Sequence, residues 1–290
     1  MPYLLSSVVC SVLVSVLLKL MQRRGIDTAQ GIAWNYLAAS LLCFTLLDPP
    51  LASLAAPHAP WRALALLAVL LPGIFLALSA SVRAAGIVRT DIAQRMSLVL
   101  SLLAAFLWFG ERADAQRLAG LAFGLIAIVL LVLRPRTETP TPSGTAGWSG
   151  WALPLVVLVG YAGIDVLLKH IAAAGTPFAA SLQVAFVAAF VVMMAVQAVR
   201  RARGGPMLTL SALGAGLLLG ALNFGNILFY VKAHRALPDN PAVVFSTMNI
   251  GVVVLGALAG MLLFHERLSR MNLLAIPLAI AAIALIALGL

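Results

Sequence analysis

Five basic side chains lie within or at the edge of apolar stretches of this chain. They are Lys19, Arg83, Arg95, Lys169 and Lys232. A charge at the centre of a lipid bilayer costs about 2.5–3.5 kcal/mol, so such a residue usually faces protein or water. One interpretation is a basic lining at the two mouths of a cavity, which would bind carboxylate or phosphate groups. The alternative is that the long side chains reach the membrane interface and bind nothing.

One acidic residue, Asp165, lies deeper in an apolar stretch than we expect for any other carboxylate of the chain. It stands one helical turn before Lys169, a spacing that allows an ion pair within a helix. Neutralisation of Lys169 is therefore one interpretation. The other is chemical, because a desolvated carboxylate can hold and exchange a proton. Asp165 is accordingly the candidate for proton coupling or for binding a substrate amine.

Uncharged polar residues in apolar stretches form a second group of candidates for substrate binding. Asn223, Asn226 and Tyr230 stand at i, i+3 and i+7, on one face of a helix. Hydrogen bonds between helices are one role for them, and hydrogen bonds to a substrate are the other. Weaker candidates of the same kind are Trp34, Asn35, Tyr36, Gln183, Ser246, Thr247 and Asn249.

The composition indicates that a lipid bilayer surrounds these residues. Of the 290 residues, 63% are hydrophobic and only 10% are charged, whereas about one quarter of a soluble domain is charged. The net charge of +10 would suggest a nucleic-acid partner for a soluble protein. Here most basic residues stand between apolar blocks, where cytoplasmic loops usually carry them. We therefore expect no nucleic-acid partner.

Nine polar or helix-breaking clusters divide the chain into ten apolar blocks. Each block has about the length that crosses a bilayer, roughly 20 residues. We therefore predict an all-α, polytopic membrane protein with ten transmembrane helices. Joining blocks across charged breaks would give an alternative with eight helices. The breaks are residues 22–28, 48–62, 86–91, 111–117, 134–150, 172–177, 200–206, 234–241 and 265–272.

The longest break, residues 134–150, is rich in Pro, Thr, Ser and Gly and is typical of a linker loop. It separates a first five-helix unit, residues 1–133, from a second one, residues 151–290. Each unit has an odd number of helices, so the second unit must enter the membrane from the opposite side. Such inverted repeats are common in secondary transporters, which place the substrate site near the middle of the membrane.

Short sequences recur at corresponding places of the two units. Val-Leu-Leu-Lys occupies residues 16–19 and again residues 166–169. "FGER" at residues 109–112 corresponds to "FHER" at residues 264–267. The repeated order of these segments supports a duplication of the whole unit.

This arrangement resembles the EamA branch of the drug/metabolite transporter superfamily. The family-like features are the "FGER" and "FHER" segments, each at the end of the fourth helix of a repeat and each followed by a helix with small residues. The resemblance covers essentially the full length. It implies ten helices around a central cavity that opens alternately to each side. It also implies movement of small organic solutes, often outward, without identifying the substrate.

We predict a secondary active transporter that exports a small carboxylate-bearing metabolite, such as an amino acid, an organic acid or an opine-type metallophore. The substrate would be anionic or zwitterionic, and a proton is the candidate coupling ion. A multidrug or cation exporter and a lipid or lipid-linked flippase are the alternatives. The chain has no phosphate-binding P-loop and no His-Glu-x-x-His or Gly-x-Ser-x-Gly motif. We therefore expect no enzyme activity, no metal and no cofactor.

The loops divide the arginines unevenly, because odd-numbered loops carry more of them than even-numbered loops. The positive-inside rule places the richer loops in the cytoplasm. We therefore expect a bacterial-type inner membrane protein with both termini on the same side, namely outside. Monomer and homodimer both stay open, because the Gly-x-x-x-Gly pairs at residues 216–220 and 256–260 can pack helices within or between protomers.

Two glutamates at the repeated segments are expected to have a structural role. Glu111 and Glu266 stand in turns before helix starts, where a carboxylate stabilises the positive end of the helix dipole. Asp114 and Ser269 follow three residues later as candidate N-caps.

Overall fold

The computed structural model describes residues 2–55, 59–109, 115–132, 149–237, 241–266 and 268–288. These residues form an all-α bundle with ten α-helices, as predicted, and one short 3-10 helix, η1, at Leu51–Ala55. The helices are α1 Pro2–Arg23, α2 Thr28–Leu47, α3 Trp61–Ala85, α4 Ile87–Phe109, α5 Ala115–Val132, α6 Ser149–Ala173, α7 Phe178–Ala202, α8 Leu210–Ala236, α9 Pro241–Phe264 and α10 Arg270–Leu288.

The ten separate helices show that the alternative with eight helices was wrong. Within the described ranges, eight helices are long and apolar enough to cross a membrane. The other two are α4, which carries Arg89, Asp91 and Arg95, and α5, whose apolar part is Leu118–Leu130.

Every predicted break contains or adjoins a helix end, but one break was predicted too long. Gly86 alone separates α3 from α4, and its φ of 89° lies in the left-handed region that favours glycine. Residues 87–91 therefore belong to α4. Of the predicted linker, residues 134–148 lie outside the described part of the chain, and residues 149 and 150 begin α6.

Polar side chains cap the starts of several helices, among them α2 and α10. The carboxylate of Asp27 accepts hydrogen bonds from the backbone N–H groups of Ala29, at 2.9 Å, and Gln30, at 3.3 Å, and so caps α2. The Ser269 hydroxyl accepts one from the Asn272 N–H at 3.2 Å, which confirms the predicted N-cap of α10. Asp114, its predicted counterpart before α5, lies outside the described residues.

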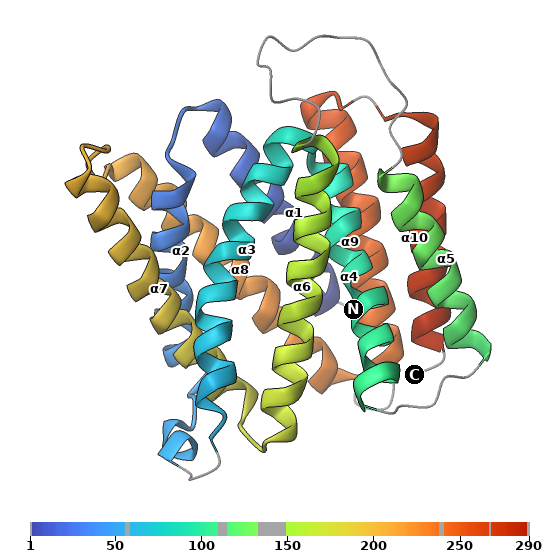
Figure 1. Ribbon diagram of the computed structural model, residues 1–290, viewed down its shortest axis with the longest axis horizontal. Coiled ribbons are helices and arrows are strands. Elements are labelled where there is room, and N and C mark those ends of the chain that lie inside the picture. Colours follow the sequence, from blue (N-terminus) through green and yellow to red (C-terminus); the bar gives the residue numbers. More distant parts are fainter. Residues whose placement is uncertain are drawn as a thin grey trace.

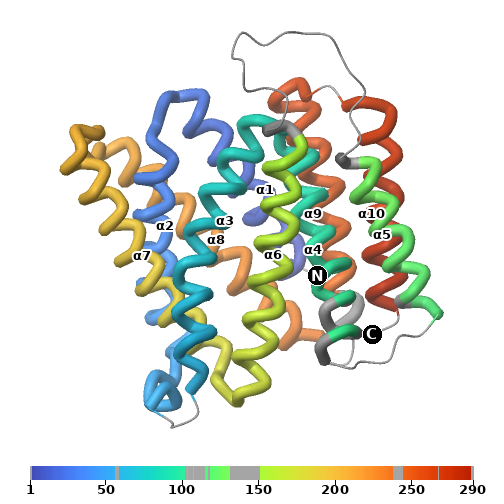
Figure 2. Tube along the Cα trace, viewed as in Figure 1, coloured from blue at the N-terminus to red at the C-terminus, as the bar shows by residue number. Residues whose placement is uncertain are grey.

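The helices pack in pairs that link the two halves of the chain. α1 packs against α8 and α9, and α6 packs against α3 and α4. Figure 1 shows α5 beside α10 at one edge of the bundle and α2 beside α7 at the other, and these pairs are in contact. Two halves related by an inverted repeat would exchange neighbours in this way, although the repeat itself stays a prediction. Figure 2 shows the same arrangement of the helices as a trace of the chain.

Small residues bring α8 close to α2 within one protomer. A Cβ on Gly216 would lie 2.6 Å from the Cβ of Trp34, and a Cβ on Gly220 would lie 2.7 Å from the Cβ of Ala38. The Gly-x-x-x-Gly pair at residues 216–220 therefore packs against α2 of the same chain. It supplies no argument for a dimer.

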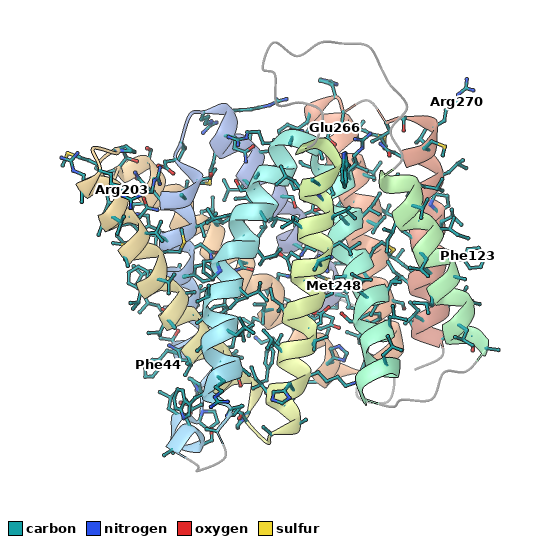
Figure 3. All side chains as sticks on the ribbon, in the orientation of Figure 1. Phe44, Phe123, Arg203, Met248, Glu266 and Arg270 are labelled. Atoms are coloured by element: carbon teal, nitrogen blue, oxygen red, sulfur yellow. The ribbon has the colours of Figure 1, made fainter. Side chains whose placement is uncertain are left out.

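The outer surface of the bundle is apolar, as lipid contact requires. Figure 3 shows Phe44 and Phe123 pointing away from the bundle on opposite sides, and both are exposed. Met248 lies inside the bundle, where it is buried. Arg203, Glu266 and Arg270 lie at one end of the bundle, the upper end in Figure 3. We call it the arginine-rich end.

Candidate functional site

A cavity of about 440 Å³ lies between α4, α6, α8 and α9, with one residue of α7 at its edge. We call it the central cavity. Four of the residues predicted to form the site line it: Arg95 from α4, Asp165 from α6, and Asn226 and Tyr230 from α8. The fold therefore brings a basic and an acidic side chain to one cavity within the bundle.

Arg95 reaches the central cavity with hydrogen bonds to uncharged groups. Its Nη2 donates to the Ser11 hydroxyl at 2.6 Å, and its Nη1 donates to Asn249 Oδ1 at 3.3 Å. Its Nε is buried without a partner. A guanidinium has five N–H donors in a planar fork. Arg95 therefore keeps donors and a positive charge for a bound ligand.

Asp165 faces the same cavity from the neighbouring helix α6. Its Oδ2 accepts hydrogen bonds from the hydroxyls of Ser101, at 2.9 Å, and Ser97, at 3.5 Å. Both serines belong to α4, so these two bonds join Asp165 to a neighbouring helix. The carboxylate is exposed to the cavity, where it can meet a proton or a ligand cation.

Aromatic and apolar side chains complete the lining of the cavity. They include Tyr161, Phe178, Phe245 and Met248. The Ser7 hydroxyl donates to Asn226 Oδ1 at 2.9 Å and holds that amide in place. The cavity thus combines a few fixed polar groups with apolar walls, which is typical of small-molecule sites.

The central cavity continues toward the end of α8. A second hollow of about 510 Å³ shares Phe178, Tyr230 and Val231 with it and extends to His234 and Arg235. Arg203, just before α8, lies at the arginine-rich end (Figure 3), so α8 carries His234 and Arg235 toward the opposite end. The site therefore extends away from the arginine-rich end.

An ion pair joins three parts of the bundle at the arginine-rich end. Lys19, near the end of α1, pairs with Glu266, which follows α9. The Glu266 carboxylate also accepts hydrogen bonds from the backbone N–H groups of Ile87, at 2.7 Å, and Val88, at 3.2 Å. The predicted structural role of Glu266 is confirmed, although the helix that it caps is α4 rather than the adjacent α10. Glu111, its predicted counterpart, lies outside the described residues.

Further contacts tie the same end together. Gln22 Nε2 on α1 donates to the backbone oxygen of Ser79 on α3 at 2.6 Å and to its hydroxyl at 2.8 Å. The Lys19 ammonium and the Arg23 guanidinium lie 4.6 Å and 4.8 Å from the centre of the Phe264 ring. These contacts join α1 to α3 and to the end of α9.

Known proteins share this sequence and this architecture. The model of the EamA-like transporter family matches residues 1–133. An uncharacterised protein of Haemophilus influenzae is 39% identical over 285 residues, which cover 97% of this chain and 95% of that protein. The chain belongs to the EamA-like transporter family. It is therefore a multi-pass membrane transporter of the drug/metabolite transporter superfamily.

One solved crystal structure has the same fold as this EamA-like transporter. The two chains are 18% identical and superpose with a TM-score of 0.60. The similarity covers 99% of this chain and 97% of the other. The fold is therefore shared along the whole chain, including the second half.

Four predicted basic residues of the EamA-like transporter are not part of the central cavity lining. Lys19 is paired with Glu266 at the arginine-rich end. Arg83 and Lys232 are exposed in the last turns of α3 and α8, and Lys169 is exposed near the end of α6. Of the five predicted cations, the fold brings only Arg95 to the cavity.

Some of the uncharged candidates line the central cavity, and others lie outside its lining. Asn223 Nδ2 donates to Asn35 Oδ1 at 3.3 Å, which is a hydrogen bond between α8 and α2. Tyr36 and Gln183 are buried in the adjoining core formed with α7. These four residues lie outside the cavity lining, whereas Asn249, a weaker candidate, is part of it.

Sequence reasoning missed Asp91, because the break that ended there was predicted too long. Asp91 is only 2% exposed, so it is a second carboxylate within the bundle besides Asp165. The Ser15 hydroxyl donates to its Oδ1 at 2.8 Å, while its Oδ2 has no partner and lies against Gly256. The spacing of Asp91 and Arg95, one helical turn apart, was the signal that both belong to one helix.

Proposed function

We propose that this transporter carries a small carboxylate-bearing metabolite through the central cavity by alternating access. The observation that supports it is the environment of Arg95, whose hydrogen bonds go to the uncharged Ser11 and Asn249. Arginine binds carboxylates through two parallel hydrogen bonds, and this pairing is strong where water is scarce. A substrate carboxylate would give the guanidinium an ionic hydrogen-bond partner, which neither Ser11 nor Asn249 provides.

Asp165 gives the same cavity a second charged position. In this proposal it carries the coupling proton, or it receives the ammonium group of a zwitterionic substrate. Ser97 and Ser101 hold the carboxylate from α4 in either case. Because Arg95 is also on α4, movement of this helix changes the surroundings of both charged groups together.

The two ends of the bundle suit an exporter that is open to the outside. The cavity extends toward His234 and Arg235, while Lys19 and Glu266 tie the arginine-rich end. The positive-inside rule assigns the arginine-rich end to the cytoplasm. On this assignment the cavity faces outward and both termini lie outside. The contacts at the arginine-rich end must then separate before substrate enters from the cytoplasm.

A cation exporter is the second candidate, and the cavity wall favours it. Tyr161, Phe178, Tyr230 and Phe245 surround the space that Asp165 faces. Aromatic faces attract organic cations, especially where water is excluded. In that case Asp165 would bind the substrate and Arg95 would repel it, unless the substrate also carried an anionic group.

Thermal unfolding of the purified protein with a panel of small metabolites separates these candidates. A ligand that binds only the folded state raises the melting temperature. We expect a rise with carboxylate-bearing anions or zwitterions. Stabilisation by organic cations alone would contradict the proposal and support the second candidate. Stabilisation by phospholipid or polyprenyl head groups alone would support a flippase.

A further inference from the structure

A separate pocket lies at the arginine-rich end, away from the central cavity. It measures about 330 Å³ and is formed by the end of α7 and the segment before α8. Gln197 and Arg201 line it from α7, and Met207 and Leu208 line it from the segment. None of these four residues lines the central cavity.

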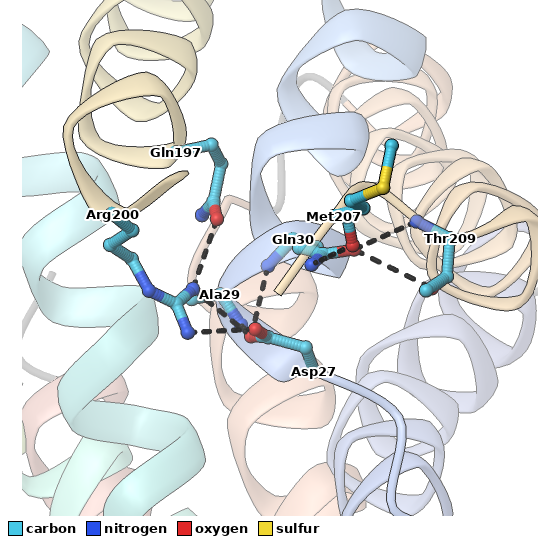
Figure 4. Close-up of polar contacts among 7 residues, drawn as sticks. All are labelled: Asp27, Ala29, Gln30, Gln197, Arg200, Met207 and Thr209. Carbon is cyan, nitrogen blue, oxygen red and sulfur yellow. Dashed lines mark hydrogen bonds and ion pairs between the residues drawn. The ribbon is translucent and has the colours of Figure 1, made fainter. Parts of the chain in front are cut away.

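Gln197 offers this pocket a hydrogen-bond donor. The side chain is only 6% exposed, and its Oε1 accepts a hydrogen bond from Arg200 Nη1 at 3.0 Å (Figure 4). Because this bond fixes the orientation of the amide, Nε2 must be the free group, and it is buried without a partner. A buried N–H group without an acceptor is unfavourable and rare in native proteins. A ligand that accepts a hydrogen bond would remove this deficit.

Arg201 supplies the positive charge of the pocket. The neighbouring Arg200 pairs with Asp27 at 2.8 Å, so that charge is already matched (Figure 4). Arg201 instead donates through Nη1 to the backbone oxygen of Gly205 at 3.2 Å, which leaves its other N–H groups available. The two polar side chains that line the pocket therefore offer donors and a positive charge.

The rest of the pocket is apolar and faces the lipid side of the bundle. Met207 is 66% exposed, and Leu208 is exposed as well. Along the outer face of α7, Val191 and Val199 are also exposed. An acyl chain could follow this face from the pocket toward the middle of the membrane, whereas a free anion would leave it uncovered.

We propose that this pocket binds an anionic phospholipid. The lipid phosphate accepts hydrogen bonds from Gln197 Nε2 and Arg201, and the acyl chain lies along Met207, Leu208 and α7. Basic pockets between transmembrane helices on the cytoplasmic side are known to suit anionic head groups. The bound lipid adjoins the Asp27–Arg200 pair, which joins α7 to the start of α2.

Native mass spectrometry of the purified protein tests the proposal with phosphatidylglycerol, phosphatidylcholine and inorganic phosphate as probes. We expect phosphatidylglycerol to bind in preference to phosphatidylcholine. Arg201→Gln should weaken this binding about tenfold, because a hydrogen bond to a charged group is lost. Arg203→Gln is the matched control: it removes an exposed arginine two residues away, outside the pocket lining, and should leave binding unchanged.

Gln197→Glu gives an independent test that keeps the surrounding contacts. The new carboxylate still accepts from Arg200, but it replaces the free donor with a negative charge that repels phosphate. We expect loss of phosphatidylglycerol binding without a lower melting temperature. Binding equal to that of the wild type would overturn the proposal. Equal weakening by Arg201→Gln and Arg203→Gln would also overturn it, as would binding of inorganic phosphate without the lipid.

Discussion

Lys19 and Glu266 form an ion pair although 247 positions separate them in the sequence. The Glu266 carboxylate also accepts hydrogen bonds from the first backbone N–H groups of α4. Gly86 leaves room for this arrangement, because a Cβ there would lie 2.6 Å from Glu266 Oε2. One carboxylate thus joins the end of α1, the start of α4 and the end of α9.

Removal of this charge should destabilise the protein. Glu266→Gln removes the negative charge that pairs with Lys19 and weakens the cap of α4, so we expect a loss of about 1–3 kcal/mol in the free energy of unfolding. Chemical unfolding in detergent measures this loss. In a double-mutant cycle with Lys19→Met, the effects of the two substitutions should fall short of additivity. Additive effects would show that the pair contributes nothing beyond its separate members.

Asp27 is expected to make a pH-dependent contribution to the stability of the folded state. Partial burial by itself raises the pKa of Asp27, but hydrogen bonds from Arg200 and from the backbone of Gln30 and Ala29, with the charge of Arg200, hold this pKa below its ordinary value. A carboxyl group with a lowered pKa stabilises the folded state above its unfolded pKa, near 4. That stabilisation is lost as the pH falls through the lower folded value.

Asp27→Ala measures this contribution. Because the substitution removes both the cap of α2 and the pair with Arg200, we expect a loss of about 0.5–2 kcal/mol at neutral pH. The difference from the wild type should stay constant above about pH 5 and shrink below about pH 4. Unfolding curves between pH 3 and pH 7 would record it. A difference that does not change with pH would rule out the ionised carboxylate as its source.

Two glycines of α8 should respond oppositely to substitution by alanine. A Cβ on Gly220 would collide with the backbone of Asn35 and lie 2.7 Å from the Cβ of Ala38. Gly220→Ala should therefore lower the stability by about 1–3 kcal/mol. Gly214 has nothing within 4 Å of the added Cβ, so Gly214→Ala should be neutral or stabilising by about 1 kcal/mol. Equal melting temperatures for the two variants would contradict the close packing of α2 and α8.

Asp165→Asn tests the proposed coupling. The amide keeps the size of the side chain and can still receive hydrogen bonds from Ser97 and Ser101, but it cannot exchange a proton near neutral pH. In proteoliposomes we expect the variant to lose accumulation driven by a pH gradient. If Asp165 carries only the proton, exchange of substrate across the membrane should continue. If it also binds a substrate ammonium, exchange should fail as well.

The matched control for that experiment is Asp48→Asn. Asp48 is an exposed carboxylate at the end of α2 with a φ of 43°, a conformation that asparagine tolerates. It should transport like the wild type. Accumulation by Asp165→Asn at the wild-type level would show that another group couples the proton.

The sequence predicted the helices well because their ends are marked locally. Breaks rich in charged residues, Gly and Pro stood between apolar blocks, and the structure places a helix end at or beside each of them. The break at residues 86–91 was predicted too long, because Gly86 and the polar residues that follow it looked like a single loop. A single glycine with a positive φ was sufficient to separate α3 from α4.

The site was predictable only in part. Arg95, Asp165, Asn226 and Tyr230 were recognisable because each is a polar residue in an apolar stretch. The sequence could not show that Lys19 pairs with a residue from the other half of the chain, since that contact depends on how the helices pack. Position along a helix therefore distinguished cavity residues from interhelical contacts poorly.

The most direct test of this account is the affinity of Arg95→Gln for the carboxylate ligand that stabilises the wild type most. Removing a hydrogen-bonded cation should weaken binding by about ten- to a hundredfold. Arg83→Gln, which removes an exposed arginine of α3 outside the cavity lining, should bind like the wild type. Calorimetric titration of the three proteins gives both comparisons. An affinity of Arg95→Gln equal to that of the wild type would contradict the claim that Arg95 binds the substrate carboxylate.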